Sequence, residues 1–242
     1  MTTPDRRTLD YHRPPTARQR DFDFWAYILP MAIFMAFTWA GSEWKNLYPL
    51  SYICKAVIVP VSLVLLWRHY TKISWDYWWL GIAMGVIGIV QWIGMEKLLM
   101  SQEWLSWTRM TRDVAKEAFN PFDHFQSPGA AWSFIAIRWA AASLVVPVME
   151  ELFWRDFLWR SIAAPNDFKL AAVGEYDPTA LVLVPLFFAT VHVQWLTAIV
   201  WGIMISLLLL KTKSLGACII MHGVTNFLLG AYVLYTREWF FW

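Results

Sequence analysis

Two adjacent acidic residues, Glu150 and Glu151, occur in an apolar segment, and a cation follows at Arg155. Positions i and i+4 lie on one face of a helix, so Glu151 and Arg155 are expected to pair. Glu150 is turned about 100° away and is left outside that pair. The spacing therefore predicts one neutralised carboxylate and one desolvated carboxylate that is available as a general base. A buried ion pair that orients a helix, or the proton site of a transporter, fits the same residues.

A second pair of polar residues, His222 and Asn226, is also spaced by four in an apolar run. Their side chains point from one helix face, about 6 Å apart. Both groups can donate hydrogen bonds to a developing oxyanion. The alternative interpretation is a polar clamp between two helices.

A third candidate, His192, lies within the longest apolar stretch, in the segment Phe188-Ala-Thr-Val-His192. A single histidine on an apolar helix is more often a hydrogen-bonded core residue than a catalyst. A helix rises about 1.5 Å per residue. Counting from the expected helix ends, we expect Glu150 to lie about 15 Å, His192 about 21 Å and His222 about 12 Å from one membrane edge. If the helices converge, we expect these three and Asn226 to lie within about 4–8 Å of one another, because water activation and oxyanion stabilisation act on one carbonyl.

The elements that position these residues are hydrophobic helices. The chain has 242 residues, of which 58% are hydrophobic, 16% are charged and 18 are tryptophan. A soluble domain is about 45–50% apolar and about 25% charged. This composition predicts a polytopic membrane protein, with tryptophan at the lipid–water interfaces. The net charge of +2 is spread along the chain and gives no support for nucleic-acid binding. Cys54 and Cys218 both lie in apolar runs, which excludes a disulfide framework.

The apolar runs predict an all-α transmembrane bundle of about seven spanning helices, with six to eight as the range. The run at 131–160 continues without a breaker to Pro165, and the charge-free stretch Leu181–Leu210 is best divided near Gln194. The other expected spans are 24–41, 49–67, 78–95 and 214–235. In the third span, glycines recur at positions 81, 85 and 88, which allows a neighbouring helix to approach closely.

The polar segments complete the expected organisation. Residues 1–23 predict a flexible cytosolic tail ahead of a single transmembrane domain at 24–242. Residues 96–130 predict an amphipathic helix on the membrane surface, followed by a loop at Asn120–Gly129. Eleven lysines and arginines fall on the side of the N-terminus and six on the other, which favours a cytosolic N-terminus.

Three segments, Glu150-Glu-x-x-x-Arg155, Phe188-x-x-x-His192 and His222-x-x-x-Asn226, follow one another on separate hydrophobic helices. Together they resemble the motifs of the CAAX prenyl protease and bacteriocin-processing (CPBP, or Abi) family of intramembrane proteases. The resemblance covers roughly residues 131–242, the protease-like core. The segment from Leu210 to Asn226 and the aromatic end Trp239–Trp242 look most like bacterial CAAX-protease-related proteins associated with exosortases.

The resemblance implies a role for each residue. Glu150 would activate water, His192 would bind or polarise that water, and His222 and Asn226 would stabilise the oxyanion. Glu151 and Arg155 would hold the framework of the site. A glutamic-type mechanism without a cofactor is the better-supported description of the family. The chain has no His-Glu-x-x-His motif, and a zinc site formed by Glu150, His192 and His222 is the alternative.

The resemblance further implies an integral protein of the bacterial inner membrane, surrounded by lipid. It would cleave a membrane-anchored protein or peptide substrate. Proteolytic activity has not been demonstrated for some members of the family. The alternative function is therefore that of a non-enzymatic partner or scaffold of an exosortase or secretion system. A transporter with a Glu/His proton relay is a third possibility, but the sequence shows no inverted repeat.

Overall fold

The computed structural model describes residues 17–102 and 118–242, with side chains from Asp21 onward, and this part of the chain is built from helices and their connections. Six of the described helices are long and apolar enough to cross a membrane. The expected all-α polytopic bundle is confirmed, and the chain is an integral membrane protein. The six segments are Asp21–Glu43, Lys45–Leu65, Trp78–Ser101, Pro128–Ala163, Trp195–Thr212 and Leu215–Thr236.

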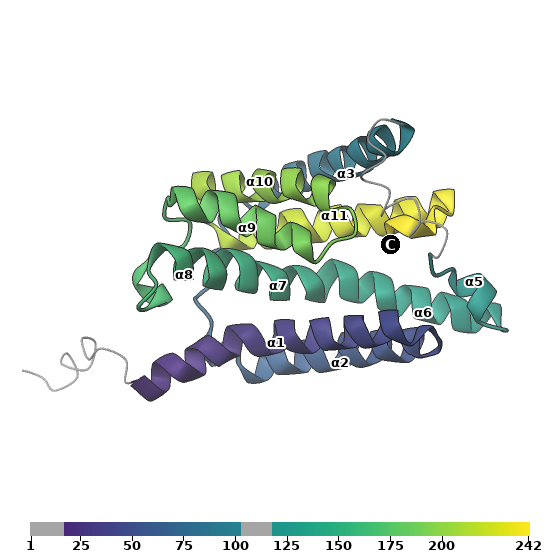
Figure 1. Cartoon of the computed structure of the whole chain (residues 1–242), viewed down its shortest axis with the longest axis horizontal. Helices are drawn as coiled ribbons and strands as arrows, with labels where there is room; N and C mark the ends of the chain where they lie inside the picture. The colour runs from purple at the N-terminus through teal and green to yellow at the C-terminus, as the bar shows by residue number, and fades with distance from the viewer. Residues whose placement is uncertain (1–16, 103–117) are drawn as a thin grey trace, which may run out of the picture.

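The helices form three layers (Figure 1). Helices α1 (Ala17–Glu43) and α2 (Tyr48–Leu65) pair as a hairpin on one side. The long middle helix contains α6 (Pro128–Ala140), α7 (Val146–Glu151) and α8 (Trp159–Ala163). On its other side lie α3 (Trp78–Ser101), α9 (Pro178–Thr190), α10 (Trp195–Thr212) and α11 (Leu215–Thr236). The middle helix therefore contacts both outer layers.

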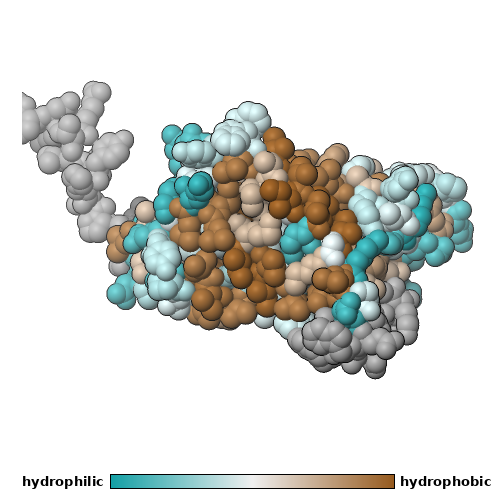
Figure 2. All heavy atoms as spheres, turned by 90° about the horizontal axis from the view of Figure 1, so that it is seen from above, coloured by the Kyte–Doolittle hydropathy of each residue, from teal (hydrophilic) through white to brown (hydrophobic). Residues whose placement is uncertain are grey.

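The surface has the pattern of a membrane protein. Figure 2 shows a hydrophobic band across the middle of the molecule and hydrophilic groups toward its two ends. Valine and leucine side chains of α2, such as Val64 and Leu65, are exposed. Exposed tryptophans lie near both ends of the spans, among them Trp39 and Trp44 at one end and Trp78 at the other. This placement matches the interfacial role expected from the composition.

The middle helix runs without a break from Pro128 to Ala163, as the sequence predicts, but two of its segments are π-helical. The first, Ala141–Val145, precedes Pro147, which has no N–H for the carbonyl of Ser143 four residues earlier. A π segment is a common way to relieve such a defect inside a helix. The second segment, Leu152–Leu158, follows directly after the two glutamates. The acidic pair therefore sits between two π segments.

Glycines allow α3 to approach α11 closely, as predicted. A Cβ atom at Gly81 would lie 2.5 Å from the carbonyl oxygen of Ala217, and one at Gly85 would lie 2.6 Å from the Cβ of Val224. Real Cβ atoms essentially never come within 3.0 Å of an atom to which they are not closely bonded. The backbones could not reach this separation with larger residues on α3.

This contact gives a first prediction. Gly85→Ala is expected to lower stability by about 1–3 kcal/mol, because the added methyl group meets the backbone and a branched side chain of α11. Gly94→Ala is the matched control on the same helix, since a Cβ there has nothing within 4 Å. The melting temperatures of both variants are measured by thermal unfolding in detergent. Equal melting temperatures for the two would contradict the packing described for α3 and α11.

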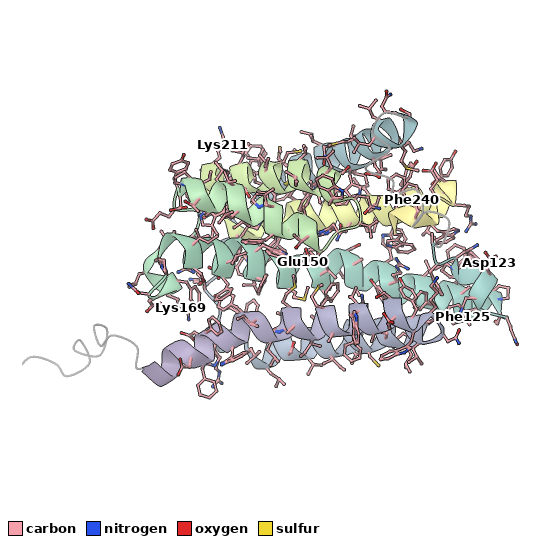
Figure 3. The ribbon with its side chains drawn as sticks, in the orientation of Figure 1. Asp123, Phe125, Glu150, Lys169, Lys211 and Phe240 are labelled. Carbon is pink, nitrogen blue, oxygen red and sulfur yellow. The ribbon has the colours of Figure 1, made fainter. Side chains whose placement is uncertain are left out.

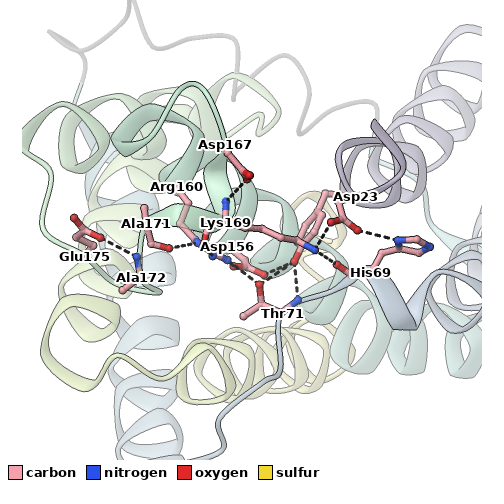
Figure 4. Close-up of polar contacts among 11 residues, drawn as sticks. Asp23, His69, Thr71, Asp156, Arg160, Asp167, Lys169, Ala171, Ala172 and Glu175 are labelled. Carbon is pink, nitrogen blue, oxygen red and sulfur yellow. Dashed lines mark hydrogen bonds and ion pairs between the residues drawn. The ribbon is translucent and has the colours of Figure 1, made fainter. Parts of the chain in front are cut away.

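A buried polar network fixes the end of the bundle that lies nearest the N-terminus (Figure 4). Asp156 accepts a hydrogen bond of 2.6 Å from the hydroxyl of Tyr27 and forms an ion pair with Arg160. Arg160 also donates to the Oγ1 atom of Thr71, at 2.7 Å. The network joins α1, the connection after α2, and the end of the middle helix.

Several boundaries differ from those expected. Helix α1 begins at Ala17, so residues 17–23 are helical rather than part of a flexible tail. The loop expected at Asn120–Gly129 contains a short helix, α5 (Pro121–His124), because Asn120 accepts a hydrogen bond from the N–H of Phe122 as its N-cap. Residues 1–16 of the tail and most of the expected surface helix (103–117) lie outside the described residues.

The third span also continues past its expected end at residue 95. Residues 96–130 were expected to form a separate surface segment, and this range begins with the charged residues Glu96 and Lys97. Glu96 is buried instead and accepts a hydrogen bond of 2.8 Å from the hydroxyl of Thr197 on α10. A carboxylate with a partner inside the bundle does not end the helix, which extends to Ser101.

Candidate active site

A cavity of about 150 Å³ lies between α7, α11 and the connection from α9 to α10. Four polar residues predicted to act together line it: Glu150, His192, His222 and Asn226. Most of the remaining wall is aromatic or aliphatic, with Trp92, Val146, Phe188, Trp201, Leu229 and Phe241. The fold therefore brings all four to one small and largely apolar space, near the middle of the bundle where Figure 3 labels Glu150.

Glu150 and Glu151 have different surroundings, as the spacing predicts. Glu150 is 5% exposed and lines the cavity. Its Oε2 atom is buried and has no hydrogen-bond partner among the residues that the structure describes. Glu151 is fully buried, and its Oε1 atom lies 3.2 Å from Nη1 of Arg155. The predicted ion pair between Glu151 and Arg155 is confirmed, and Glu150 stands outside it.

Glu151 has a second partner that the sequence does not reveal. The Nδ1 atom of His222 lies 2.8 Å from the same Oε1 atom that contacts Arg155. Because an ionised carboxylate only accepts hydrogen bonds, His222 donates from Nδ1. The buried guanidinium of Arg155 lies 4.8 Å over the ring of Phe188. Glu151 thus fixes both a cation and the orientation of an imidazole that lines the cavity.

The one available sequence signal for this contact is the general requirement that a buried imidazole has an acceptor. That requirement does not tell which acid supplies the acceptor. Glu151 and His222 are 71 positions apart, and their contact depends on how α7 packs against α11.

His192 lies in the connection between α9 and α10, not on a helix as expected. Helix α9 ends at Thr190, and the Nδ1 atom of His192 is 2.8 Å from the carbonyl oxygen of Phe188. A carbonyl oxygen only accepts, so Nδ1 carries the proton and donates it. In the neutral ring, the Nε2 atom is then left as an acceptor.

Asn226 joins α11 to the first π segment of the middle helix. Its Nδ2 atom donates a hydrogen bond of 2.8 Å to the carbonyl oxygen of Ala142. This contact is the interhelical clamp considered as an alternative role. The amide has a second N–H and a carbonyl oxygen, so the clamp does not use all of its hydrogen-bonding capacity.

Metal binding was the alternative chemistry for this site. Among the described residues, no group of three or more His, Cys, Asp and Glu side chains is arranged to hold a metal ion. Glu150, His192 and His222, the residues of the alternative zinc site, all line the cavity.

One comparison with known proteins, the family-model match, covers this part of the chain. Residues 132–228 match the model of a family described as type II CAAX prenyl endopeptidase Rce1-like. No curated protein and no solved structure shows significant similarity to the chain. The matched segment begins in α6, ends in α11, and contains Glu150, His192, His222 and Asn226. It supports the family resemblance and, together with the six long apolar helices found among the described residues, an intramembrane protease.

Proposed function

We propose that the protein is an intramembrane endopeptidase of the glutamic type, which hydrolyses a peptide bond in a membrane-anchored protein segment. One observation carries the proposal. A carboxylate that forms no ion pair within the described part of the chain, Glu150, shares a small apolar cavity with His192, His222 and Asn226. General acid–base chemistry and oxyanion stabilisation require groups of these kinds around one carbonyl.

In the first step, a water molecule lies between Glu150 and His192. Both groups accept hydrogen bonds, since Glu150 is a carboxylate and His192 donates from Nδ1 to a backbone carbonyl. A water that donates one hydrogen to each directs a lone pair at the substrate carbonyl. Glu150 takes the proton as the water attacks, and later gives it to the leaving amine.

In the same step, negative charge develops on the carbonyl oxygen of the substrate. We assign the stabilisation of this charge to the Nε2–H group of His222 and the second N–H of Asn226. An imidazole that donates from both nitrogens is protonated, so this assignment requires an imidazolium at that stage. Glu151, 2.8 Å from Nδ1, is its counter-ion.

The proposal includes no cofactor, which gives a second prediction. Incubation of the purified protein with a strong chelator is expected to leave most of the cleavage activity in place, because the base is a carboxylate rather than metal-bound water. The measurement is the cleavage rate before and after chelation, with and without added Zn²⁺. Loss of activity on chelation and recovery with Zn²⁺ would contradict the glutamic assignment.

For the surroundings, we propose the bacterial inner membrane with a cytosolic N-terminus. Figure 3 labels Lys169 and Lys211 at the end of the bundle near the N-terminus. Among the described residues at or beyond the helix ends, Arg68, Lys72 and Lys213 lie at that same end, whereas Lys45, Lys97 and Arg237 lie at the other. This bias follows the positive-inside rule. An exosortase-type partner remains part of the proposal on the resemblance of the motifs alone.

The proposed activity is tested with the purified full chain in liposomes that carry a library of membrane-anchored peptides. Mass spectrometry of the products is expected to show cleavage at discrete bonds. In H₂¹⁸O, one heavy oxygen enters each new carboxylate, because water is the attacking group. Wild-type protein that cleaves nothing in the library would refute the proposed activity and favour the scaffold function.

A further inference from the structure

A second and larger cavity, of about 670 Å³, adjoins the proposed catalytic cavity. It lies at the end of the bundle remote from the N-terminus, where Figure 3 labels Asp123, Phe125 and Phe240. Its walls come from the end of α1, the start of α2, α5 and the C-terminal turn Trp239–Phe241. We refer to it as the outer chamber. The outer chamber and the catalytic cavity share two lining residues, Gln194 and Phe241.

The two shared residues lie at the boundary between the cavities, and we refer to this boundary as the neck. Phe241 is 5% exposed, and its ring packs at 4.1 Å from that of Phe240 and at 5.8 Å, edge-on, from that of Tyr232. Gln194 is the N-cap residue of α10, two positions after His192, and its Nε2 atom donates to the carbonyl oxygen of Phe240 at 3.3 Å. One hydrogen bond thus ties the C-terminal turn to the connection that carries His192.

The two cavities differ in what they can hold. Binding sites for small ligands typically have volumes of about 300–1,000 Å³. The outer chamber falls in that range, whereas the catalytic cavity, at about 150 Å³, has room for little more than a carbonyl group with its water and one small side chain. A peptide that places its scissile bond beside Glu150 must therefore have its flanking residues elsewhere.

The walls of the outer chamber suit a peptide with apolar side chains. Tyr48, Phe119 and Trp239 contribute aromatic rings to its lining, and Asn120 and Gln194 contribute amide groups, beside the ionisable side chains of Lys45, Asp123 and His124. Aromatic surfaces bind apolar side chains, and amide groups can pair with a peptide backbone.

We propose that the outer chamber binds the substrate residues next to the scissile bond, and that Phe241 with Gln194 limits the size of the side chain that passes toward Glu150. The substrate segment is an extended peptide with apolar side chains, entering from the end of the bundle opposite the N-terminus. This inference rests on the proposed peptidase function. Phe241 lies outside the segment that matches the family model, so the neck depends on residues beyond that segment.

Binding in the outer chamber is tested by photo-crosslinking, which does not require turnover. Phe240 is replaced by p-benzoylphenylalanine in the Glu150→Gln variant, and the membrane-anchored peptide library is added before illumination. The matched control carries the same group in place of Phe187, an exposed phenylalanine of α9 that lines neither cavity. A peptide adduct at position 240 and none at position 187 is expected. The absence of an adduct at position 240, or equal adducts at positions 240 and 187, would contradict the proposal that the outer chamber binds the substrate.

The neck is tested by the size preference of cleavage. Phe241→Leu is expected to raise the ratio of cleavage rates for bulky over small residues at the scissile bond by about 10-fold or more, the lower limit for a pocket changed by a few carbon atoms. Phe187→Leu is the control and keeps the wild-type ratio. If the Phe241→Leu protein cleaves peptides with the wild-type ratio of rates for bulky over small residues, Phe241 does not limit the size of the side chain that reaches Glu150.

The two experiments separate this inference from the proposed activity. If the wild type cleaves nothing but position 240 crosslinks to peptide, the outer chamber stands and the peptidase function fails. If the wild type cleaves and position 240 forms no adduct, the peptidase function stands and the chamber fails.

Discussion

Glu150→Gln is expected to lower the rate of peptide cleavage by at least about 100-fold, the low end for the loss of a general base, and to leave the melting temperature near that of the wild type. Glutamine has nearly the same shape as glutamate but does not take a proton from water. The structural loss is small because Oε2 of Glu150 has no hydrogen-bond partner in the described part of the chain. The measurements are product formation from a membrane-anchored peptide and thermal unfolding in detergent.

Two results would overturn this assignment. Cleavage by Glu150→Gln at the wild-type rate would show that another group activates the water. A large fall in melting temperature would show that Glu150 supports the fold, which its surroundings in the cavity argue against.

Glu151→Gln is expected to fail in a different way, by loss of stability and activity together. Glu151 and Arg155 are both fully buried, and Glu151 also accepts from His222. Removing the carboxylate leaves a buried cation without its counter-ion, which typically costs about 3–5 kcal/mol. His222 also loses the charged acceptor that orients its ring toward the cavity. Thermal unfolding is expected to show a lower melting temperature, and the same protein is expected to cleave poorly.

The double variant Glu151→Gln/Arg155→Gln is the control for this interpretation. Removing both charges leaves no unpaired buried ion, so part of the lost stability is expected to return. Cleavage is not expected to return with it, because His222 still lacks its charged partner. A Glu151→Gln protein that unfolds at the wild-type temperature would contradict the role of Glu151 in the framework.

Local spacing predicts a substantial part of this arrangement. The interval of four between Glu151 and Arg155 is a property of one helix, and the structure confirms the pair. The break near Gln194 follows from the length of the apolar stretch, and Gln194 is indeed the N-cap of α10. Glycines on α3 predict a close neighbour, although their spacing does not identify it as α11. Each of these features depends on residues that lie close together in the sequence.

Features that depend on contacts between distant segments could not be predicted in the same way. The position of His192 beyond the end of α9 follows from where that helix ends, which the uniform apolar sequence does not show. The bond between His222 and Glu151 depends on how two helices pack. The outer chamber joins α5 and the C-terminal turn to the end of α1, and these segments are far apart in the sequence.

The most direct test of the central claim, that Glu150 and His192 act on one water molecule, is a double-mutant cycle on the cleavage rate. Glu150→Gln, His192→Gln and the double variant are compared with the wild type on one peptide, per folded molecule. If both residues hold the same water, its activation is already lost in Glu150→Gln. The double variant is then expected to cleave within about twofold of Glu150→Gln, the margin in which independent effects normally add. A double variant whose loss equals the product of the two single losses would contradict a shared water.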